Sequence, residues 1–450
     1  MTETHHTVGI IGGGITGLAL THYLAEQGVD SIVLEAADEP GGVISTKQVD
    51  GHILEAGPQR MRKTPGVAEL ADAAGVADRF VEAKQEDLYV YADGELGQAP
   101  LSVSAFFKTD LLSWRGKARM VAEPLTDNGS PEERAGELFV RKFGQEAYEK
   151  FIGPLYGGIY GSDPMEMPAA FALEGLLAQE QKAGSLLQAF RKRVGGGHSA
   201  PPVTFEGGNQ TLPAALCDTY SDRVHLDTPV TSIEPVDDGR VEAKDGSGPY
   251  YLETANESYE VDQAVVTTPA DIAGELLSDL GDGTDELDNL RYNPLAMVFL
   301  EADHDWVGKG YQVGYGEELH TLGVSWNSQM FGRDGVQTVF LGGMHEPELL
   351  QASDERLGEI ATREFKEAVG TAASVITVER LDVGFPAWDS SWWLLDDIDL
   401  PTDVHMATNY TARMGIPSRV REARQLADEL ATLEYGTASA ETTVSTPADD

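Results

Sequence analysis

TVGIIGGGITG, residues 7–17, is the stretch of this sequence that decides how its fold begins. A β-rich run up to residue 11 leads into three consecutive glycines, and the apolar residues after them recur with helical spacing. Gly28 ends this helix, and residues 31–34 form a second strand that ends at Glu35. The stretch therefore predicts a βαβ unit.

The glycines of this unit match G-x-G-x-x-G between a strand and a helix, the context that dinucleotide binding requires. Gly12 permits the tight turn, Gly14 lets the backbone approach a pyrophosphate, and Gly17 allows the helix to pack closely on the strand. The helix N-terminus offers N–H groups and a positive dipole to phosphates. Glu35 follows at the distance where a carboxylate accepts hydrogen bonds from ribose hydroxyls.

A second glycine pair indicates a flavin rather than a nicotinamide. Gly41 and Gly42 offer backbone without Cβ to a long, extended cofactor, although the same pair would suit an ordinary turn after Pro40. Val230 lies in a short apolar strand whose main chain is a candidate partner for the adenine, although a valine in such a strand is also ordinary core. The predicted cofactor is FAD.

Composition restricts the partners and the location. With 75 acidic and 32 basic residues, the net charge of −43 predicts adaptation to a salt-rich cytoplasm, with an acidic mesophilic protein as the alternative, and argues against nucleic acid as a partner. Cys217 is the single cysteine, and no histidine shows metal-ligand spacing, so we expect neither a disulfide nor a metal. No apolar run is long enough to span a bilayer. We expect a cytoplasmic protein. The sequence is compatible with a homodimer and with weak peripheral membrane contact.

The expected fold class is α/β, a Rossmann-like FAD-binding domain with a mixed α/β substrate domain and a helical insertion. Prolines separate the helix-like stretches of the insertion, and Gly195-Gly196-Gly197 marks a flexible joint at its end. The expected divisions are the FAD-binding domain in three parts (1–87, 199–269 and 396–435), a helical, substrate- and membrane-proximal insertion (88–198), a substrate domain (270–395) and a disordered acidic tail (436–450).

Longer motifs resemble the oxygen-dependent protoporphyrinogen oxidases of the flavin amine oxidase superfamily, over nearly the whole chain. They are EAGPQRMR (55–62), LLSWRGK (111–117), PLYGGIYGSDP (154–164), GGNQTLP (207–213) and NY (409–410) with GIP (415–417). The resemblance implies that the flavin is contacted by Gly57, Pro58, Asn409, Gly415 and Ile416. The chain departs from the family pattern in two places. Thr408 stands where a glycine is usual, and residues 418–420 read SRV where an aspartate is commoner.

The resemblance implies FAD-dependent oxidation of protoporphyrinogen or coproporphyrinogen to the porphyrin in heme biosynthesis, with molecular oxygen as acceptor. Arg62 is the candidate catalytic residue, because a guanidinium binds a propionate carboxylate bidentately; its alternative role is a surface ion pair. Arg60 and Lys63 would reinforce the positive charge. Two other functions stay open: another oxidoreductase of the superfamily, an amine oxidase or carotenoid-type desaturase, and a non-catalytic flavin- or tetrapyrrole-binding protein.

Overall fold

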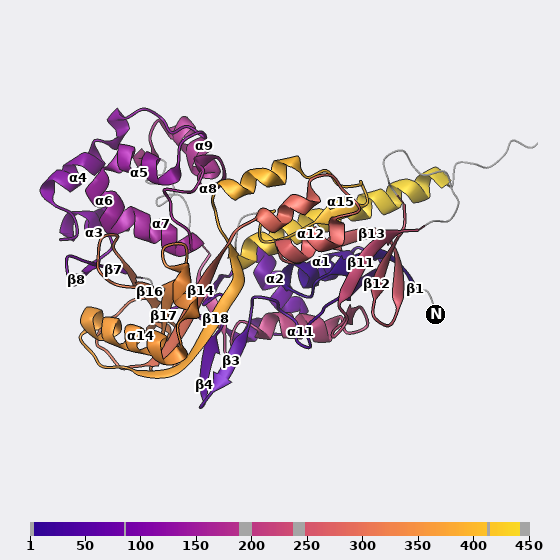
Figure 1. Ribbon diagram of the computed structural model, residues 1–450, viewed down its shortest axis with the longest axis horizontal. Coiled ribbons are helices and arrows are strands. Elements are labelled where there is room, and N and C mark those ends of the chain that lie inside the picture. The colour runs from indigo at the N-terminus through magenta and orange to yellow at the C-terminus, as the bar shows by residue number, and fades with distance from the viewer. Residues whose placement is uncertain (1–3, 85–86, 189–199, 237–247, 412–414, 442–450) are drawn as a thin grey trace, which may run out of the picture.

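The computed structural model describes residues 4–84, 87–188, 200–236, 248–411 and 415–441. Two large sheets lie side by side, and a lobe of helices stands over one of them (Figure 1). Both ends of the described chain lie at the first sheet: β1 (Thr4–Ile11) is one of its strands, and α15 (Ile416–Glu441) packs in the core beside it. The α/β class expected from the sequence is confirmed.

The predicted βαβ unit is present as β1, α1 (Ile15–Glu26) and β2 (Ser31–Leu34). β1 pairs in parallel with β2 on one side and with β13 (Ser258–Val266) on the other. All four residues of β2 are buried, as expected of a parallel strand covered on both faces. Across the sheet the order is β10 (Val224–His225), β2, β1, β13, β12 (Tyr250–Thr254) and β11 (Val230–Pro235), with β19 (Val404–Met406) parallel to the end of β13.

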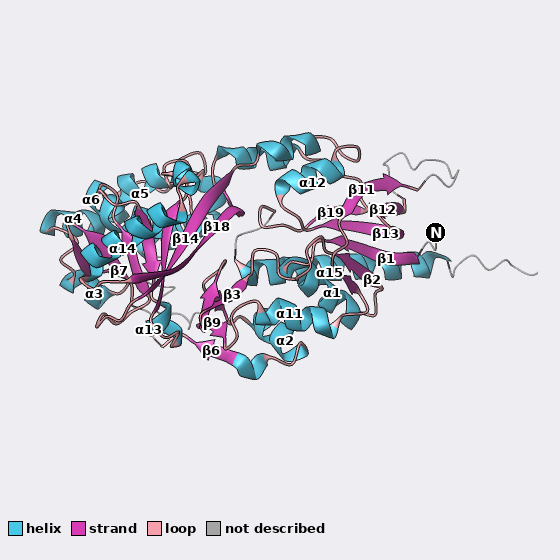
Figure 2. Cartoon of the chain, turned by 60° about the horizontal axis from the view of Figure 1, so that its bottom comes forward, coloured by secondary structure: helices cyan, strands magenta, loops and turns pink. Residues whose placement is uncertain are grey.

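Helices cover both faces of this sheet (Figure 2). Val8 and Ile10 of β1 face a core shared with α1, α2 (Pro65–Ala73), α11 (Thr211–Thr219) and α15. Ile11 faces the opposite core, which α12 (Ala270–Leu277) and part of the helical lobe complete. The alternation of side chains along β1 thus separates two hydrophobic layers.

The second sheet is mostly antiparallel, and α14 (Asp354–Val369) packs on it in the place that the sequence predicted. The strands predicted near residues 295, 322, 339 and 375 are all present. The order is β18 (Ser374–Pro386), β14 (Tyr292–Glu301), β17 (Val336–Gly342), β16 (Thr321–Ser325), β15 (Gly310–Val313), β7 (Tyr89–Ala92) and β8 (Glu95–Gln98).

Residues 89–98 differ from the helical character expected from Leu88 onward. They form the β7–β8 hairpin, which extends the second sheet through β15. The turn is Asp93-Gly94, and both residues have positive φ, +56° and +80°. Aromatic and β-branched residues before an Asp-Gly pair are a hairpin signal, so the pattern was present in the sequence.

The helical lobe follows the hairpin. Its α5 (Ala135–Phe143) has the predicted bounds, whereas the helix predicted over 171–181 is split at Leu173. A buried ion cluster holds the lobe together: the Lys142 Nζ lies 3.3 Å from Glu123 Oε1 and also contacts Glu180. The other lobe helices are α3 (Val103–Lys108), α4 (Trp114–Val121), α6 (Gln145–Ala147), α7 (Gly153–Tyr160), α8 (Ala169–Ala172) and α9 (Glu174–Ala183).

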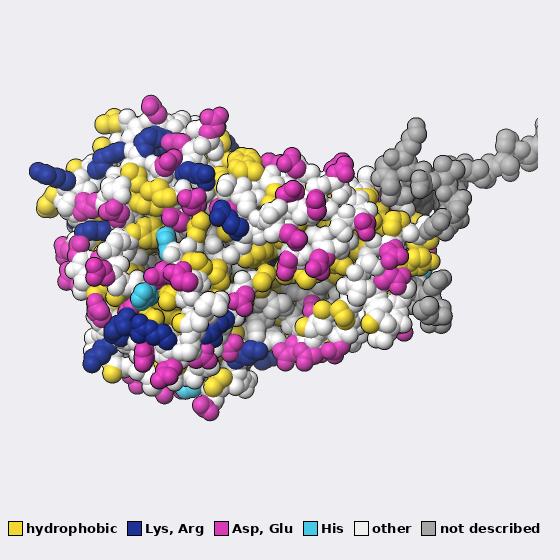
Figure 3. All heavy atoms as spheres, in the orientation of Figure 1, with side chains coloured by type: hydrophobic (Ala, Val, Ile, Leu, Met, Phe, Trp, Pro, Cys, Tyr) yellow, Lys and Arg dark blue, Asp and Glu magenta, His cyan; other side chains and the backbone are white. Residues whose placement is uncertain are grey.

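Small elements complete the described chain: β3 (Thr46–Val49), β4 (His52–Glu55), β5 (Met61–Arg62), β6 (Phe80–Glu82), β9 (Pro202–Phe205) and α13 (Asn327–Phe331). α15 continues over 436–441, where the sequence analysis expected an unfolded tail; residues 442–450, the glycine joint at 195–197 and a strand expected at 241–243 lie outside the described residues. None of the described helices is both long and apolar enough to cross a membrane. Acidic side chains are spread over the visible surface, while Lys and Arg gather on the half that holds the second sheet and the helical lobe (Figure 3).

Candidate cofactor site

The glycine loop between β1 and α1 makes two very close approaches. Gly12 has φ +114°, and a Cβ there would lie 2.5 Å from Thr267 Oγ1. A Cβ on Gly17 would lie 2.1 Å from the carbonyl oxygen of Gly12. Both distances are far shorter than van der Waals contact. Glycine at position 12 therefore lets the loop approach Thr267, and glycine at position 17 lets α1 stand close to the loop and to β1.

Gly14 has open space instead. It caps the N-terminus of α1 in an extended conformation without a side-chain hydrogen bond, and no described atom lies within 4 Å of the position that its Cβ would take. The first N–H groups of a helix lack partners within the helix, and the dipole adds positive charge there. The space beside Gly14 is therefore suited to an anion such as a pyrophosphate.

Gly41 and Gly42 lie directly beside this loop. The Gly41 N–H donates to the Gly13 carbonyl at 2.9 Å, and Gly14 pairs with Gly41 as a parallel bridge. Both have positive φ, +124° and +58°. A Cβ on Gly42 would lie 3.6 Å from the Gly14 Cα. The two glycine motifs thus form one strip of bare backbone.

Glu35 directly follows β2 and lies next to the same strip. Its carboxylate accepts hydrogen bonds from the N–H groups of Gly13 at 2.5 Å and Ala37 at 2.8 Å, which fixes its orientation. The Thr228 N–H donates to the Glu35 carbonyl at 2.8 Å, and this bond brings the start of β11, with Val230, beside the acid. A carboxylate oxygen has further lone pairs, so Glu35 can still accept from sugar hydroxyls.

A buried carboxylate that the sequence analysis did not single out joins two of the longer motifs. Glu55 accepts hydrogen bonds from the Asn209 N–H at 3.1 Å and from the Thr46 and Thr204 hydroxyls at 2.9 and 3.1 Å. Burial raises the pKa of Glu55 above its usual range. The Asn209 side chain donates to the Pro58 carbonyl at 2.6 Å. These contacts hold Gly57 and Pro58 against the loop at 207–213. The sequence contained one indication of this contact, because Glu55 and Asn209 both lie in the motifs quoted above.

The closing segment explains one departure from the family pattern. The buried Thr408 hydroxyl accepts from the N–H groups of Tyr410 at 3.3 Å and Thr411 at 3.2 Å, a local turn contact that glycine cannot make. Asn409 is partly buried in this turn. Gly415, at φ +104°, precedes α15, and Ile416 packs in the same core as Ile44 and Met61.

Arg62 lies at the surface on β5, and its guanidinium donates to the Ala200 carbonyl at 3.0 Å. Within the described part of the chain, no carboxylate lies within the 4.0 Å that defines an ion pair with Arg62. Lys63, in contrast, lies 3.9 Å from Glu82 and over the ring of Phe80. The surface ion pair considered for Arg62 is therefore not formed with any described residue.

The helical lobe meets the two sheets at one junction. The Asn293 side chain, on β14, donates to the Gly161 carbonyl at 2.8 Å and the Ser162 hydroxyl at 2.7 Å. The Tyr410 hydroxyl donates to the Thr268 carbonyl at 3.2 Å, where β13 ends. The Ala270 N–H, shortly after β13, donates to the Tyr292 hydroxyl at the start of β14 at 3.0 Å. The motif at 154–164, the start of β14 and the closing segment thus converge near the carboxyl end of β13, the side of an α/β sheet where ligands bind.

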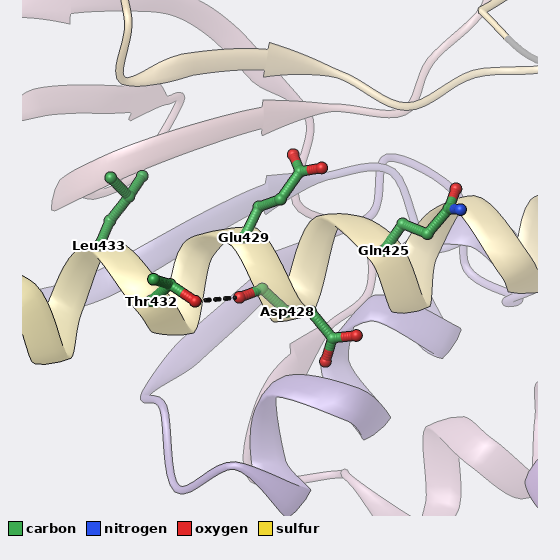
Figure 4. Close-up of a pocket in the computed structure, with 5 residues that line it drawn as sticks. All are labelled: Gln425, Asp428, Glu429, Thr432 and Leu433. Carbon is green, nitrogen blue, oxygen red and sulfur yellow. Dashed lines mark hydrogen bonds between the residues drawn. The ribbon is translucent and has the colours of Figure 1, made fainter.

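A surface hollow along α15 lies elsewhere. It is lined by Gln425, Asp428, Glu429, Thr432 and Leu433 (Figure 4). All of these belong to one helix, and the Thr432 hydroxyl is used in a bond to the Asp428 carbonyl at 2.8 Å. None of the predicted site residues lines the hollow, so we do not assign the cofactor site to it.

The donor set at the glycine strip fits a flavin dinucleotide. The strip provides free helix N–H groups at Gly14, an oriented acid at Glu35 and open backbone at Gly42, the features that a pyrophosphate and a ribose require. From there the shared core of Ile44, Met61 and Ile416 leads to the N-terminus of α15.

Comparisons with known proteins agree with this geometry. Residues 15–428 match the family model of the flavin containing amine oxidoreductases. The chain is 26% identical to protoporphyrinogen oxidase 2 of Arabidopsis thaliana, over 86% of this chain and 85% of that protein. It is 24% identical to coproporphyrinogen III oxidase of Bacillus subtilis, over 82% of this chain and 84% of that protein. A solved structure from Exiguobacterium sp. 255-15, provisionally named a protoporphyrinogen oxidase, has the same fold, with a TM-score of 0.78, 23% identity and coverage of 96% and 100%.

Proposed function

Since the chain belongs to the flavin containing amine oxidoreductases and is an FAD-dependent oxidoreductase, we propose that it oxidises a porphyrinogen to the porphyrin in heme biosynthesis, with molecular oxygen as electron acceptor. One observation carries this proposal. Relatives named for protoporphyrinogen and for coproporphyrinogen each align with more than four fifths of this chain. When bound, FAD would supply the hydride-accepting group, and the protein would supply position and charge.

In this proposal the cofactor is held by the strip and the closing segment. The N-terminus of α1 at Gly14 would bind the pyrophosphate, and Glu35 the ribose, with Val230 beside the adenine. Gly12 and Gly17 would act indirectly by placing α1. The remaining contacts would come from Gly41, Gly42, Gly57, Pro58, Asn409, Gly415 and Ile416.

Arg62 would bind a propionate of the substrate. The Arg62 guanidinium has no acidic partner among the described residues, so its positive charge can attract an anion. This matters because the net charge of −43 repels anions from the rest of the surface. We expect Arg62→Met to raise KM for the porphyrinogen about tenfold, which corresponds to a loss of about 1.4 kcal/mol of binding free energy. The kcat and the FAD affinity should be nearly unchanged. Lys63→Met is the matched control, because Lys63 already faces Glu82. An unchanged KM in Arg62→Met would remove Arg62 from substrate binding.

Weak membrane contact would use the outer face of the helical lobe. Phe107, Trp114, Val121 and Leu125 are 63%, 81%, 56% and 88% exposed. The Lys117 ammonium lies 5.4 Å from the Trp114 ring centre and 3.4 Å from the Phe107 carbonyl. Phe107 of α3 and Lys117 of α4 come together only through the fold. Flotation with anionic vesicles should be lost in Trp114→Ala; equal flotation of both proteins would contradict the proposal.

The reaction is tested with purified, FAD-loaded protein in molar salt. We expect oxygen uptake and the appearance of porphyrin fluorescence with protoporphyrinogen or coproporphyrinogen, and neither with primary amines. Turnover of amines would assign the chain to the amine oxidases instead. A yellow protein inert toward all of these substrates would favour a carrier without turnover.

A further inference from the structure

Three side chains with metal-binding chemistry meet at the end of α1 that lies away from the glycine loop. His22 and Glu26 are one helical turn apart on α1, and Glu69 comes from α2. One ligand atom of each lies within 4.8 Å of the others. No metal was expected from the sequence, because no histidine shows metal-ligand spacing. Glu69 belongs to a different helix and comes close only through folding.

His22 has an unused nitrogen aimed at this cluster. Its side chain is 2% exposed, and its Nδ1 lies 2.7 Å from the Tyr220 hydroxyl. The Nε2, in contrast, is buried and has no hydrogen-bond partner among the described residues. With the Nδ1 proton donated to Tyr220, the Nε2 lone pair faces the carboxylates, the arrangement in which a neighbouring group fixes the ligand tautomer.

The spacing fits a shared ion better than a direct bond. His22 Nε2 lies 3.7 Å from Glu26 Oε2, too far for a hydrogen bond. Ligand atoms about 2.1 Å from a tetrahedral zinc ion stand about 3.4 Å apart, close to this separation. Because the three ligand atoms already lie within 4.8 Å of one another, adjustment of the Glu26 and Glu69 side chains would complete the geometry.

Charge at the cluster also favours a cation. Two carboxylates face one another here, and the positive group packed against them is Arg424 of α15, whose guanidinium lies 2.8 Å from Glu69 and over the Tyr23 ring. Arg424 therefore competes with a metal for Glu69 without neutralising Glu26. The imidazole nitrogen selects against magnesium and calcium, which prefer oxygen ligands only.

We propose that His22, Glu26 and Glu69 bind a divalent cation of the zinc class, which fastens α1 to α2. The site lies on the helix whose other end carries the glycine loop, about 12–18 Å away at 1.5 Å per residue, so its occupancy is separate from the flavin chemistry. The proposal does not depend on the proposed reaction.

The test is calorimetric titration of Zn²⁺ into chelator-treated, FAD-loaded protein. The background carries His5→Gln and His6→Gln, because these N-terminal histidines also stand beside carboxylates. We expect one equivalent to bind. Glu26→Gln should weaken this binding at least tenfold, and Arg424→Gln should tighten it, because Glu69 is released.

Asp72→Asn is the matched control, an exposed carboxylate on α2 outside the cluster, and it should leave the affinity unchanged. Both test positions have exposed side chains, so the variants are expected to fold. The proposal is overturned if the background protein binds no Zn²⁺, or if Glu26→Gln binds it as tightly as the background.

Discussion

At the scale of single residues, Gly14 and Gly17 share one motif but are glycines for different reasons. A side chain at Gly17 would collide with the Gly12 carbonyl, which is backbone and cannot move aside. A side chain at Gly14 would meet no described atom. Gly17 is therefore needed for folding, and Gly14 keeps space free for a ligand.

This difference gives a prediction with opposite outcomes. Gly14→Ala should leave the thermal stability of the flavin-free protein within about 0.5 kcal/mol and raise the Kd for FAD at least tenfold, about 1.4 kcal/mol, because the methyl group occupies the phosphate space. Gly17→Ala should destabilise the flavin-free protein itself. Quenching of flavin fluorescence and melting curves separate the two effects. FAD affinity equal to wild type in Gly14→Ala would contradict our placement of the pyrophosphate.

A second residue-scale prediction concerns pH. Burial lowers the pKa of His405, which lies on β19 with its Nε2 2.9 Å from Gln263. The unfolded chain, with a histidine pKa of about 6.5, takes up this proton first, so stability is lost as the pH falls below that value. Between pH 7.5 and 5.5, His405→Gln should lose less unfolding free energy than wild type in urea titrations at constant salt.

The prediction concerns the difference between wild type and His405→Gln in how the unfolding free energy changes with pH. It does not concern the change in either protein alone. Burial raises the pKa of Glu55, so protonation of that carboxyl in the folded state acts in the opposite direction. Because Glu55 is present in both proteins, its contribution cancels in the difference. Equal losses in wild type and His405→Gln would show that His405 does not contribute to acid sensitivity.

At the scale of elements, the helical lobe depends on a buried charge. Lys142 of α5 contacts Glu123 and Glu180, and the Glu123 carboxylate also accepts the N–H groups of Leu186 and Leu187. The cluster thus links α5, α9 and the segment after α9. Removing the ammonium would leave two carboxylates buried together without a cation.

We therefore expect Lys142→Met to destabilise the lobe by about 3–5 kcal/mol, the usual cost of breaking a buried ion pair from one side. Limited proteolysis should then cleave within residues 100–188 at a lower temperature than in wild type. Lys182→Met, an exposed lysine of α9, is the control and should change stability by less than about 0.5 kcal/mol. Equal protease resistance of all three proteins would refute this role of Lys142.

At the scale of the whole molecule, the charge of −43 predicts that folding depends on salt. The half built on the first sheet shows mainly acidic side chains on its visible face (Figure 3). Repulsion between such charges reaches about 10 Å at 0.1 M salt and about 3 Å at 1 M. The folded state brings these charges closer together than the unfolded chain does, so salt should favour it.

The unfolding free energy from urea titrations should accordingly be higher in 2 M than in 0.1 M KCl. A variant with Asp72→Asn, Asp279→Asn and Asp285→Asn, all exposed, should show a smaller salt effect than wild type. This comparison separates screening of charge from the general strengthening of apolar burial by salt. A salt effect of equal size in both proteins would argue against charge screening as its cause.

The sequence by itself determined the βαβ unit, the position of α14 and most strands of the second sheet. These follow from local patterns, namely glycine spacing and apolar periodicity, which act between near neighbours in the chain. It also indicated the family, because the motifs that resemble the family are short, continuous runs of residues. The β7–β8 hairpin was readable from Asp93-Gly94 in the same way, although we interpreted that region as helical.

Only the tertiary structure decided which of these pieces meet. The bond from Gly41 to Gly13, the attachment of Glu55 to Asn209 and the approach of Glu69 to His22 each join residues from separate elements. No local periodicity encodes such contacts, because they depend on how helices and loops pack around the sheets. Whether a buried polar atom such as His22 Nε2 has a partner is likewise settled only when the whole chain has folded around it.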